Sequence, residues 1–159
     1  MAQVSSRSPR LVKALARLRA ADPILASIID KVGPFRMDYR DPVFETLVRS
    51  IVYQQLSGQV ASVIYRRVLN ATGEPLTPER LASVGFDTLR GAGLSKQKAT
   101  YVLDAAARAG SIGFEQLPNL STDEVIERLT TVKGVGVWTA HMFLIFALRR
   151  PDILPTLDL

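Results

Sequence analysis

The chain has 159 residues, 47% of them hydrophobic, and 20 lysines and arginines against 15 aspartates and glutamates give a net charge of +5. This length and apolar content exclude an intrinsically disordered chain and predict a buried core. The positive charge is compatible with a polyanionic partner such as nucleic acid, and the absence of cysteine excludes disulfides, zinc–cysteine sites and iron–sulfur clusters.

The first ten residues are rich in serine and arginine and contain no acid. This composition fits an organelle transit peptide or a flexible basic terminus before the first helix, and we favour the terminus. The apolar, uncharged run at residues 134–148 is shorter than the roughly 20 residues that a membrane helix needs. We therefore expect no membrane contact and an intracellular monomer, cytoplasmic or at the nucleoid in a bacterium and nuclear in a eukaryote.

Apolar residues recur at helical spacing along the chain, and no stretch shows sustained period-two alternation. Helix starts are indicated by proline after Asp22, Asp41 and Thr77, by Ser95, and by a capping box that begins at Ser121. The predicted helices cover residues 11–20, 23–32, 43–56, 59–71, a short segment from 78, 96–109, 122–130 and 137–148. We predict an all-α protein, a compact helical bundle that forms one domain over residues 1–159.

A glycine-containing turn joins the last two predicted helices and reads Val-Lys-Gly-Val-Gly-Val between Thr131 and Trp138. Gly134 and Gly136 allow positive φ and the close approach of a phosphate. The unpaired amides of the following helix and its dipole favour an anion, and Lys133 can add a positive charge. The same residues could also form a tight interhelical turn without a ligand. We predict that the turn binds a nucleic-acid backbone.

Four further features of the sequence carry a family resemblance together with this turn. They are Asp41-Pro-x-Phe44, Ile51-Val-Tyr-Gln-Gln-Leu-Ser57, Gly93-Leu-Ser-x-x-Lys98, and the acid Asp158, which follows Gly136 by 22 positions. With the block Val132-Lys-Gly-Val-Gly-x-Trp-Thr-Ala140, they resemble the helix-hairpin-helix DNA glycosylase superfamily, and more closely its 3-methyladenine-DNA glycosylase II family. The resemblance covers roughly residues 41–159, which include the helix-hairpin-helix DNA-binding motif.

The resemblance implies a monofunctional glycosylase that flips an alkylated base out of duplex DNA and hydrolyses its N-glycosidic bond, which initiates base excision repair. The substrates would be 3-methyladenine and 7-methylguanine. Asp158 would be the catalytic residue, because cleavage develops oxocarbenium character that an ionised carboxylate stabilises. Glycosylases that also cleave the strand carry a lysine at the position of Trp138, so tryptophan there implies an enzyme that uses water.

By the same resemblance, Leu56 would be the wedge that enters the base stack, and Gln55 would be its polar neighbour. Trp138, Tyr53 and Met142 would line the base pocket, where an aromatic face attracts a cationic base. Ordinary core packing is an alternative for Leu56, Trp138, Tyr53 and Met142, and a solvated surface position is an alternative for Gln55.

The expected phosphate ligands lie in the hairpin and at the start of another helix: Lys133, Gly134, Val135, Gly136, Ser95 and Lys98. In the family, carbonyls of the turn also hold a monovalent cation, Na⁺ or K⁺. By position these would be the carbonyls of Thr130, Val132 and Val135. The resemblance implies no other cofactor.

In the family a further helix follows the catalytic acid, so we expect this helix to be missing from the present chain, where only Leu159 follows Asp158. Two other functions remain open from the sequence. One is a helix-hairpin-helix module that binds DNA without catalysis. The other is a helical scaffold for protein interactions, in which the turn binds no phosphate.

Overall fold

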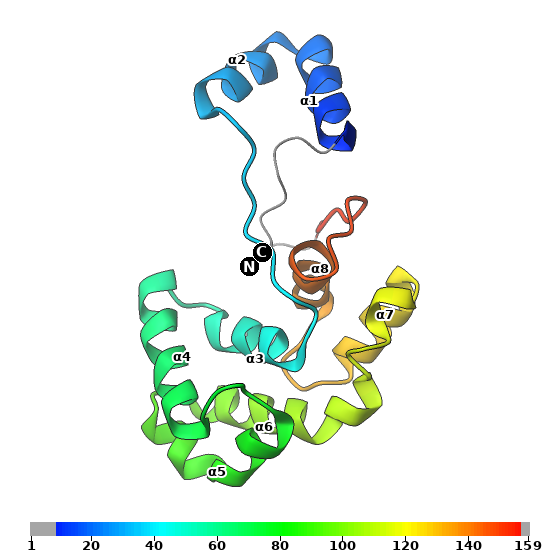
Figure 1. Cartoon of the computed structure of the whole chain (residues 1–159). Helices are drawn as coiled ribbons and strands as arrows, with labels where there is room; N and C mark the ends of the chain where they lie inside the picture. Colours follow the sequence, from blue (N-terminus) through cyan, green and yellow to red (C-terminus); the bar gives the residue numbers. More distant parts are fainter. Residues whose placement is uncertain (1–8, 157–159) are drawn as a thin grey trace. The chain divides into compact units, whose positions relative to one another are not determined.

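The computed structural model describes residues 9–156. All secondary-structure elements of more than one residue in this range are helices, as predicted (Figure 1). The described chain falls into two compact units, which divide between Arg40 and Asp41. We expected a single domain. That prediction is not tested by the position of the described hydrophobic core, which begins at Phe44 and includes no residue of the first unit; α2 has no buried residue.

The first unit consists of α1 (Pro9–Ala21) and α2 (Pro23–Val32), which pack against each other. The Asp22 carboxylate accepts hydrogen bonds from the N–H groups of Ile24 (2.7 Å) and Leu25 (3.2 Å), which confirms it as the N-cap of α2. An ion pair between Arg19 and Asp30 joins the two helices.

The second unit contains the remaining helices. They are α3 (Phe44–Tyr53), α4 (Gly58–Thr72), α5 (Pro78–Gly91), α6 (Lys96–Ile112), the 3₁₀ turn η1 (Leu117–Asn119), α7 (Thr122–Thr130) and α8 (Val137–Phe146). Helix α3 packs against α4, α6 and α8, and α6 packs against α3, α5 and α7. These two helices therefore form the centre of the unit (Figure 1).

Helix α3 begins later than the sequence indicates. We predicted Asp41 as its N-cap, but the helix starts at Phe44, and Val43 precedes it without a side-chain cap. The Asp41 carbonyl accepts hydrogen bonds from the Thr46 hydroxyl (2.7 Å) and the Val43 N–H (2.9 Å). These bonds hold the Asp41–Pro42 step in a turn ahead of the helix, so the predicted cap is wrong.

Three other predicted caps are confirmed. The Thr77 and Ser95 hydroxyls accept hydrogen bonds from N–H groups of the first turns of α5 and α6. At α7, the Ser121 N–H donates to the Glu124 carboxylate (2.7 Å), and the Glu124 N–H donates to the Ser121 hydroxyl (3.3 Å), which completes the predicted capping box.

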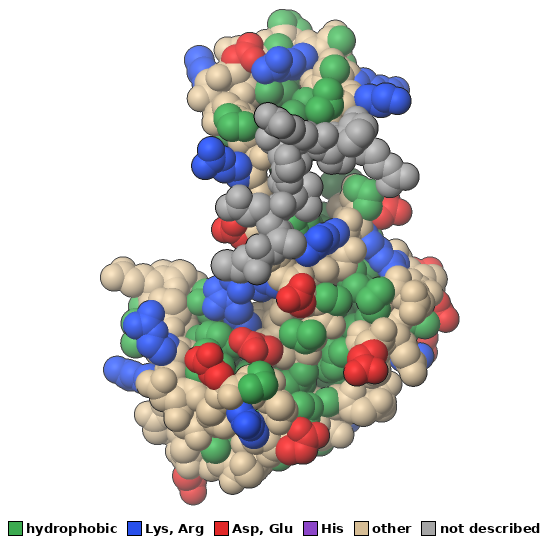
Figure 2. All heavy atoms as spheres, viewed as in Figure 1, with side chains coloured by type: hydrophobic (Ala, Val, Ile, Leu, Met, Phe, Trp, Pro, Cys, Tyr) green, Lys and Arg blue, Asp and Glu red, His purple; other side chains and the backbone are tan. Residues whose placement is uncertain are grey.

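The surface of the second unit carries charges of both signs. On the face seen in Figure 2, acidic side chains lie among basic and apolar ones, so positive charge does not cover that face uniformly. None of the helices within residues 9–156 is long and apolar enough to cross a membrane.

Candidate nucleic-acid interface

The turn between α7 and α8 is fixed in place by apolar contacts. The side chains of Val132 and Val135 are buried in the core. Gly134 has a φ of +78°, as predicted, and its backbone lies against the ring of Tyr101 from α6. A Cβ atom added at Gly134 would lie only 2.1 Å from Cδ2 of that ring. The glycine is therefore required by the close approach of the protein's own helix as well as by its φ.

The free amides of the hairpin lie at its two glycines and at the start of α8. The Lys133 N–H donates to the Asp104 carboxylate (2.9 Å), and the Val135 N–H donates to the Val132 carbonyl (3.1 Å), so both are used within the protein. Gly136 precedes α8 with no side-chain cap, and the first N–H groups of a helix have no intrahelical acceptor. The N–H groups of Val137, Trp138 and Thr139 are therefore available to an anion, as are those of Gly134 and Gly136, which donate to none of the described residues. Phosphate contacts at Lys133, Gly134, Val135 and Gly136 stay predictions.

The two predicted glycines of the turn differ in conformation. Gly136 has a φ of −92°, in the ordinary extended region, so the positive φ that we allowed there is wrong. A Cβ atom added at Gly136 would meet no atom of the described protein within 4 Å. The backbone conformation requires glycine at position 134 but not at position 136. The space beside Gly136 and the amides of α8 is open.

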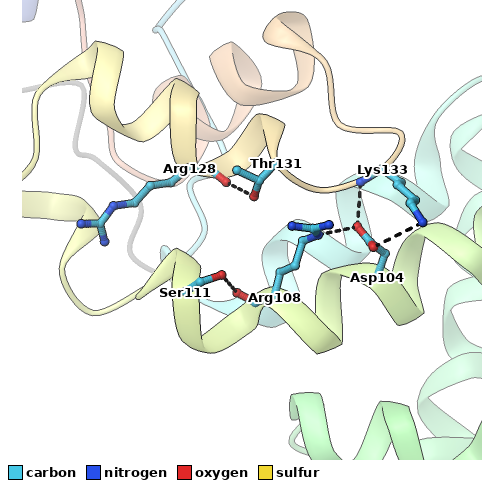
Figure 3. Close-up of polar contacts among 6 residues, drawn as sticks. All are labelled: Asp104, Arg108, Ser111, Arg128, Thr131 and Lys133. Atoms are coloured by element: carbon cyan, nitrogen blue, oxygen red, sulfur yellow. Dashed lines mark hydrogen bonds and ion pairs between the residues drawn. The ribbon is translucent and has the colours of Figure 1, made fainter.

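Asp104 of α6 holds the hairpin at Lys133 (Figure 3). Its carboxylate also accepts a hydrogen bond from Arg108 Nε (3.0 Å) and lies 3.9 Å from Lys133 Nζ. The Arg128 guanidinium points away from this cluster and donates to the Ile112 carbonyl (3.0 Å). Burial by itself raises the pKa of Asp104, but the Lys133 N–H and the Arg108 guanidinium outweigh it and lower that pKa.

This lowered pKa predicts an acid dependence of stability. Because the folded-state pKa lies below the unfolded one, ionised Asp104 stabilises the fold above the unfolded pKa, and this contribution is lost as the pH falls through the folded pKa. We expect the free energy of unfolding of the wild type to fall more steeply below about pH 4 than that of Asp104→Asn. Urea unfolding at several pH values measures the difference. The control Asp87→Asn, at an exposed position of α5, should keep the wild-type slope; equal slopes for all three proteins would contradict the prediction.

The predicted wedge lies in the exposed turn between α3 and α4, residues 54–57, which we call the wedge turn. Helix α3 ends at Tyr53, three residues before the predicted end, and Gln55 has a φ of +55°, an unfavourable conformation for a residue other than glycine. The Gln55 side chain makes no hydrogen bond to the described residues, and Leu56 is 37% exposed. Core packing of Leu56 is thus excluded. The insertion of both residues into DNA stays a prediction.

Gln54, which we did not predict as a site residue, joins this turn to the hairpin. Its side-chain amide nitrogen, Nε2, donates to the Gly134 carbonyl (2.9 Å) and to the Thr139 hydroxyl (3.2 Å). Lys98 Nζ donates to the carbonyls of Val52 (2.7 Å) and Gln54 (2.6 Å). The ammonium that we expected to bind phosphate therefore caps the end of α3, and burial lowers its pKa. Its predicted phosphate contact is not tested.

The predicted pocket residues lie on two helices. Trp138, in the first turn of α8, is 36% exposed, and half-buried Met142 lies one turn further on the same face. Tyr53 of α3 is half-buried; Arg49 lies 3.7 Å from its ring centroid, and Tyr65 packs edge-on against it. Trp138 is therefore not a core residue. One face of Tyr53 is already covered, and among the described residues no ring contact joins Tyr53 to Trp138.

Three other predicted contributions can be placed only in part. Asp158 lies outside the described residues. Ser95 is exposed and caps α6, which leaves its phosphate contact a prediction. The predicted cation ligands Thr130, Val132 and Val135 bracket the turn, and the Val132 carbonyl accepts one N–H. Nothing in the structure tests the cation.

Sequence reasoning missed Tyr101 and Asp104 of α6, which organise the site, and assigned Lys98 of the same helix only to phosphate. Lys98, Tyr101 and Asp104 follow one another at a spacing of three, which places them along one side of a helix. In the structure they contact Gln54, Gly134 and Lys133, respectively. The spacing was readable in the sequence, but their partners are distant in the chain and became clear only from the fold.

Comparisons with known proteins agree with this arrangement. Residues 48–159 match the HhH-GPD superfamily of base excision DNA repair proteins. The chain is 35% identical over 159 residues to DNA-3-methyladenine glycosylase 1 of Schizosaccharomyces pombe, an alignment that covers 94% of this chain and 69% of that protein.

Two solved structures share the fold. A DNA-3-methyladenine glycosidase from Bacillus halodurans superposes with a TM-score of 0.80 at 39% identity, over 100% of this chain and 73% of that one. A 3-methyladenine DNA glycosylase of Schizosaccharomyces pombe in complex with abasic DNA gives a TM-score of 0.81 at 33% identity, over 92% and 75%. With the hairpin and the uncapped start of α8, these matches show that the chain belongs to the HhH-GPD superfamily of base excision DNA repair proteins.

Proposed function

We infer that the protein is a monofunctional DNA glycosylase of base excision repair that hydrolyses the N-glycosidic bond of an alkylated base. The observation that carries this function is the direct link between two surfaces. Gln54 ties the turn that exposes Leu56 to the hairpin that presents the free amides of α8 and exposed Trp138. Family membership and the DNA complex of a relative support the same conclusion.

In this function the amides at the start of α8 hold a phosphate of duplex DNA. Leu56 fills the gap left by the flipped nucleotide, and Gln55 offers hydrogen bonds to the orphaned base. Trp138 stacks against the extruded base, with Met142 beside it on the same helix face. Asp158 stabilises the positive charge that develops on the sugar and orients the attacking water. A cationic base such as 3-methyladenine or 7-methylguanine leaves readily, so the mechanism needs no strong general acid.

We also propose that the carbonyls of Thr130, Val132 and Val135 hold a monovalent cation at the hairpin, as the family resemblance implies. Neutral carbonyl oxygens are hard donors that suit such an ion. The hydrogen bond from the Val135 N–H leaves the Val132 carbonyl its second lone pair. Bound there, the cation would supply positive charge next to a DNA phosphate.

The proposed activity is tested by base release. Duplex DNA that contains methylated purines is incubated with the protein, and free 3-methyladenine and 7-methylguanine are measured alongside binding to the same duplex. We expect release of both bases and formation of abasic sites. Salt-sensitive binding without release would instead favour the non-catalytic DNA-binding module, and undetectable binding at low salt would favour the protein scaffold. The enzyme would act inside the cell, wherever the genome lies.

Gly136→Ala tests the phosphate site separately from the fold. The new methyl group enters open space beside the amides of α8, so it should hinder a phosphate without disturbing the protein. We expect about tenfold weaker binding to duplex DNA, equivalent to about 1.4 kcal/mol, and less than about 1 kcal/mol of lost stability at this N-cap position. Fluorescence anisotropy and urea unfolding measure the two quantities.

The matched control is Gly110→Ala in α6, where an added Cβ atom also meets nothing within 4 Å. It should leave the affinity for DNA unchanged. If Gly136→Ala binds duplex DNA as tightly as the wild type does, the phosphate must bind elsewhere.

A further inference from the structure

We propose that Gln54 is a positioning residue which, held by Lys98, sets the distance between the wedge turn and the hairpin. A DNA strand bound at the hairpin is thereby presented to Leu56 in the register needed for base flipping. This inference rests on the proposed function and deepens it, because it assigns the coupling between phosphate binding and insertion to residues that contact neither the base nor the sugar.

The Gln54 side chain has both of its N–H donors engaged. Nε2 donates to the Gly134 carbonyl at 2.9 Å and to the Thr139 hydroxyl at 3.2 Å, across sequence separations of 80 and 85 residues. An amide nitrogen has two hydrogens, so these bonds satisfy its donors and fix its orientation. Thr139 is buried, which excludes water as a ready substitute. The side chain thus connects the residue next to Gln55 with the hairpin turn and with the first turn of α8.

Lys98 fixes the main chain of the same residue. Its ammonium donates to the carbonyls of Val52 and Gln54, at the C-terminal end of α3, where a cation is favoured by the helix dipole. One turn along α6, the Tyr101 ring contacts Gly134, which is also the acceptor of the Gln54 amide. Helix α6 therefore contacts both Gln54 and Gly134, the donor and the acceptor of this hydrogen bond. The wedge turn and the hairpin thus pack on the same helix.

Loss of the Gln54 hydrogen bonds should affect base release but not binding to undamaged DNA. The free amides at the start of α8 remain when Gln54 is changed, so binding to undamaged DNA should persist. Insertion of Leu56 and presentation of the sugar depend on alignment, and a displacement of about 1 Å can reduce a catalytic rate about 100-fold. The change should therefore lower the rate of the chemical step and the affinity for abasic DNA. It should leave the affinity for undamaged DNA nearly unchanged.

The test compares Gln54→Leu, which keeps the bulk and loses the donors, with Lys98→Met and Lys98→Arg. The matched control is Lys96→Met, an exposed lysine at the start of the same helix. We expect single-turnover base release to fall at least about tenfold in Gln54→Leu and Lys98→Met. The affinity of Gln54→Leu for undamaged duplex should stay within about twofold of that of the wild type. Lys98→Arg should restore release, because guanidinium can donate to both carbonyls.

The double variant Gln54→Leu/Lys98→Met should lose little more than either single variant, because both changes break one connection. A general structural defect would instead weaken undamaged-DNA binding in parallel with release, and Lys98→Arg would not recover the rate. Either of these results, or wild-type release in Gln54→Leu, would overturn the proposal.

A second measurement keeps this inference separate from the proposed function. Hydrogen exchange of the DNA-free protein should be faster in residues 131–139 of Gln54→Leu than in those of the wild type or Lys96→Met. If the wild type releases no base, the glycosylase function fails, and the exchange rates still decide whether Gln54 holds the hairpin. Unchanged exchange in Gln54→Leu would refute the tie, whatever the activity.

Discussion

Replacing Gly134 with alanine is expected to destabilise the protein by about 2–5 kcal/mol, a sum of two effects. Alanine at the observed φ of +78° costs about 1–2 kcal/mol. Its Cβ atom would also lie 2.1 Å from Tyr101 Cδ2, so the ring or the turn must move, at about 1–3 kcal/mol for such overpacking. Urea unfolding measures the loss of free energy of unfolding. Binding to DNA should also be lost, because the hairpin turn is distorted.

A double-mutant cycle separates the two effects. In a Tyr101→Ala background the clash is absent, and Gly134→Ala should cost only the backbone term of about 1–2 kcal/mol. Gly136→Ala is the matched control in the same turn, since its φ of −92° suits any residue and its surroundings are open. A Gly134→Ala variant as stable as Gly136→Ala would show that the turn does not pack on Tyr101.

Asp158→Asn is expected to lower single-turnover release of methylated bases by at least about 100-fold, the usual effect of removing an electrostatic contact to the transition state. Asparagine has nearly the same size but carries no charge, so the stabilisation of the oxocarbenium ion is lost while binding to DNA is kept. The measurements are the release rate from methylated duplex and the affinity for the same duplex.

The control for this variant is Asp152→Asn, which neutralises an exposed acid nearby in the sequence. It should release bases at the wild-type rate, which separates a specific role of Asp158 from a change in net charge. Equal release by the wild type and Asp158→Asn would remove this carboxylate from the mechanism. Parallel loss in both variants would show that the effect is not specific to Asp158, because removing a negative charge should strengthen rather than weaken binding to DNA.

The sequence determined the helices wherever a local signal sets them. Asp22, Thr77, Ser95 and Ser121 each cap the helix that they were predicted to cap, because a side-chain oxygen and an N–H two or three residues later meet without help from the rest of the fold. The positive φ of Gly134 was likewise expected from its residue type.

Local signals failed where a competing contact was present. Asp41 is not a cap, because its carbonyl instead binds Thr46 and Val43. Helix α3 stops at Tyr53 rather than at Leu56, and Lys98 from another helix binds the carbonyls at its end. The apolar pattern of the sequence continued to Leu56 and gave no sign of this partner.

The sequence by itself determined the all-α class and the hairpin, whereas the exposure of Leu56, for which core packing was an alternative, came from the structure. Only the tertiary structure decided which groups are available to a ligand. It assigns the Lys133 amide to Asp104 and the Lys98 ammonium to α3, and it leaves the first amides of α8 free. The reason is physical: a hydrogen-bonding group is satisfied by whatever the fold brings within about 3 Å, and sequence spacing specifies such partners only within one helix or turn.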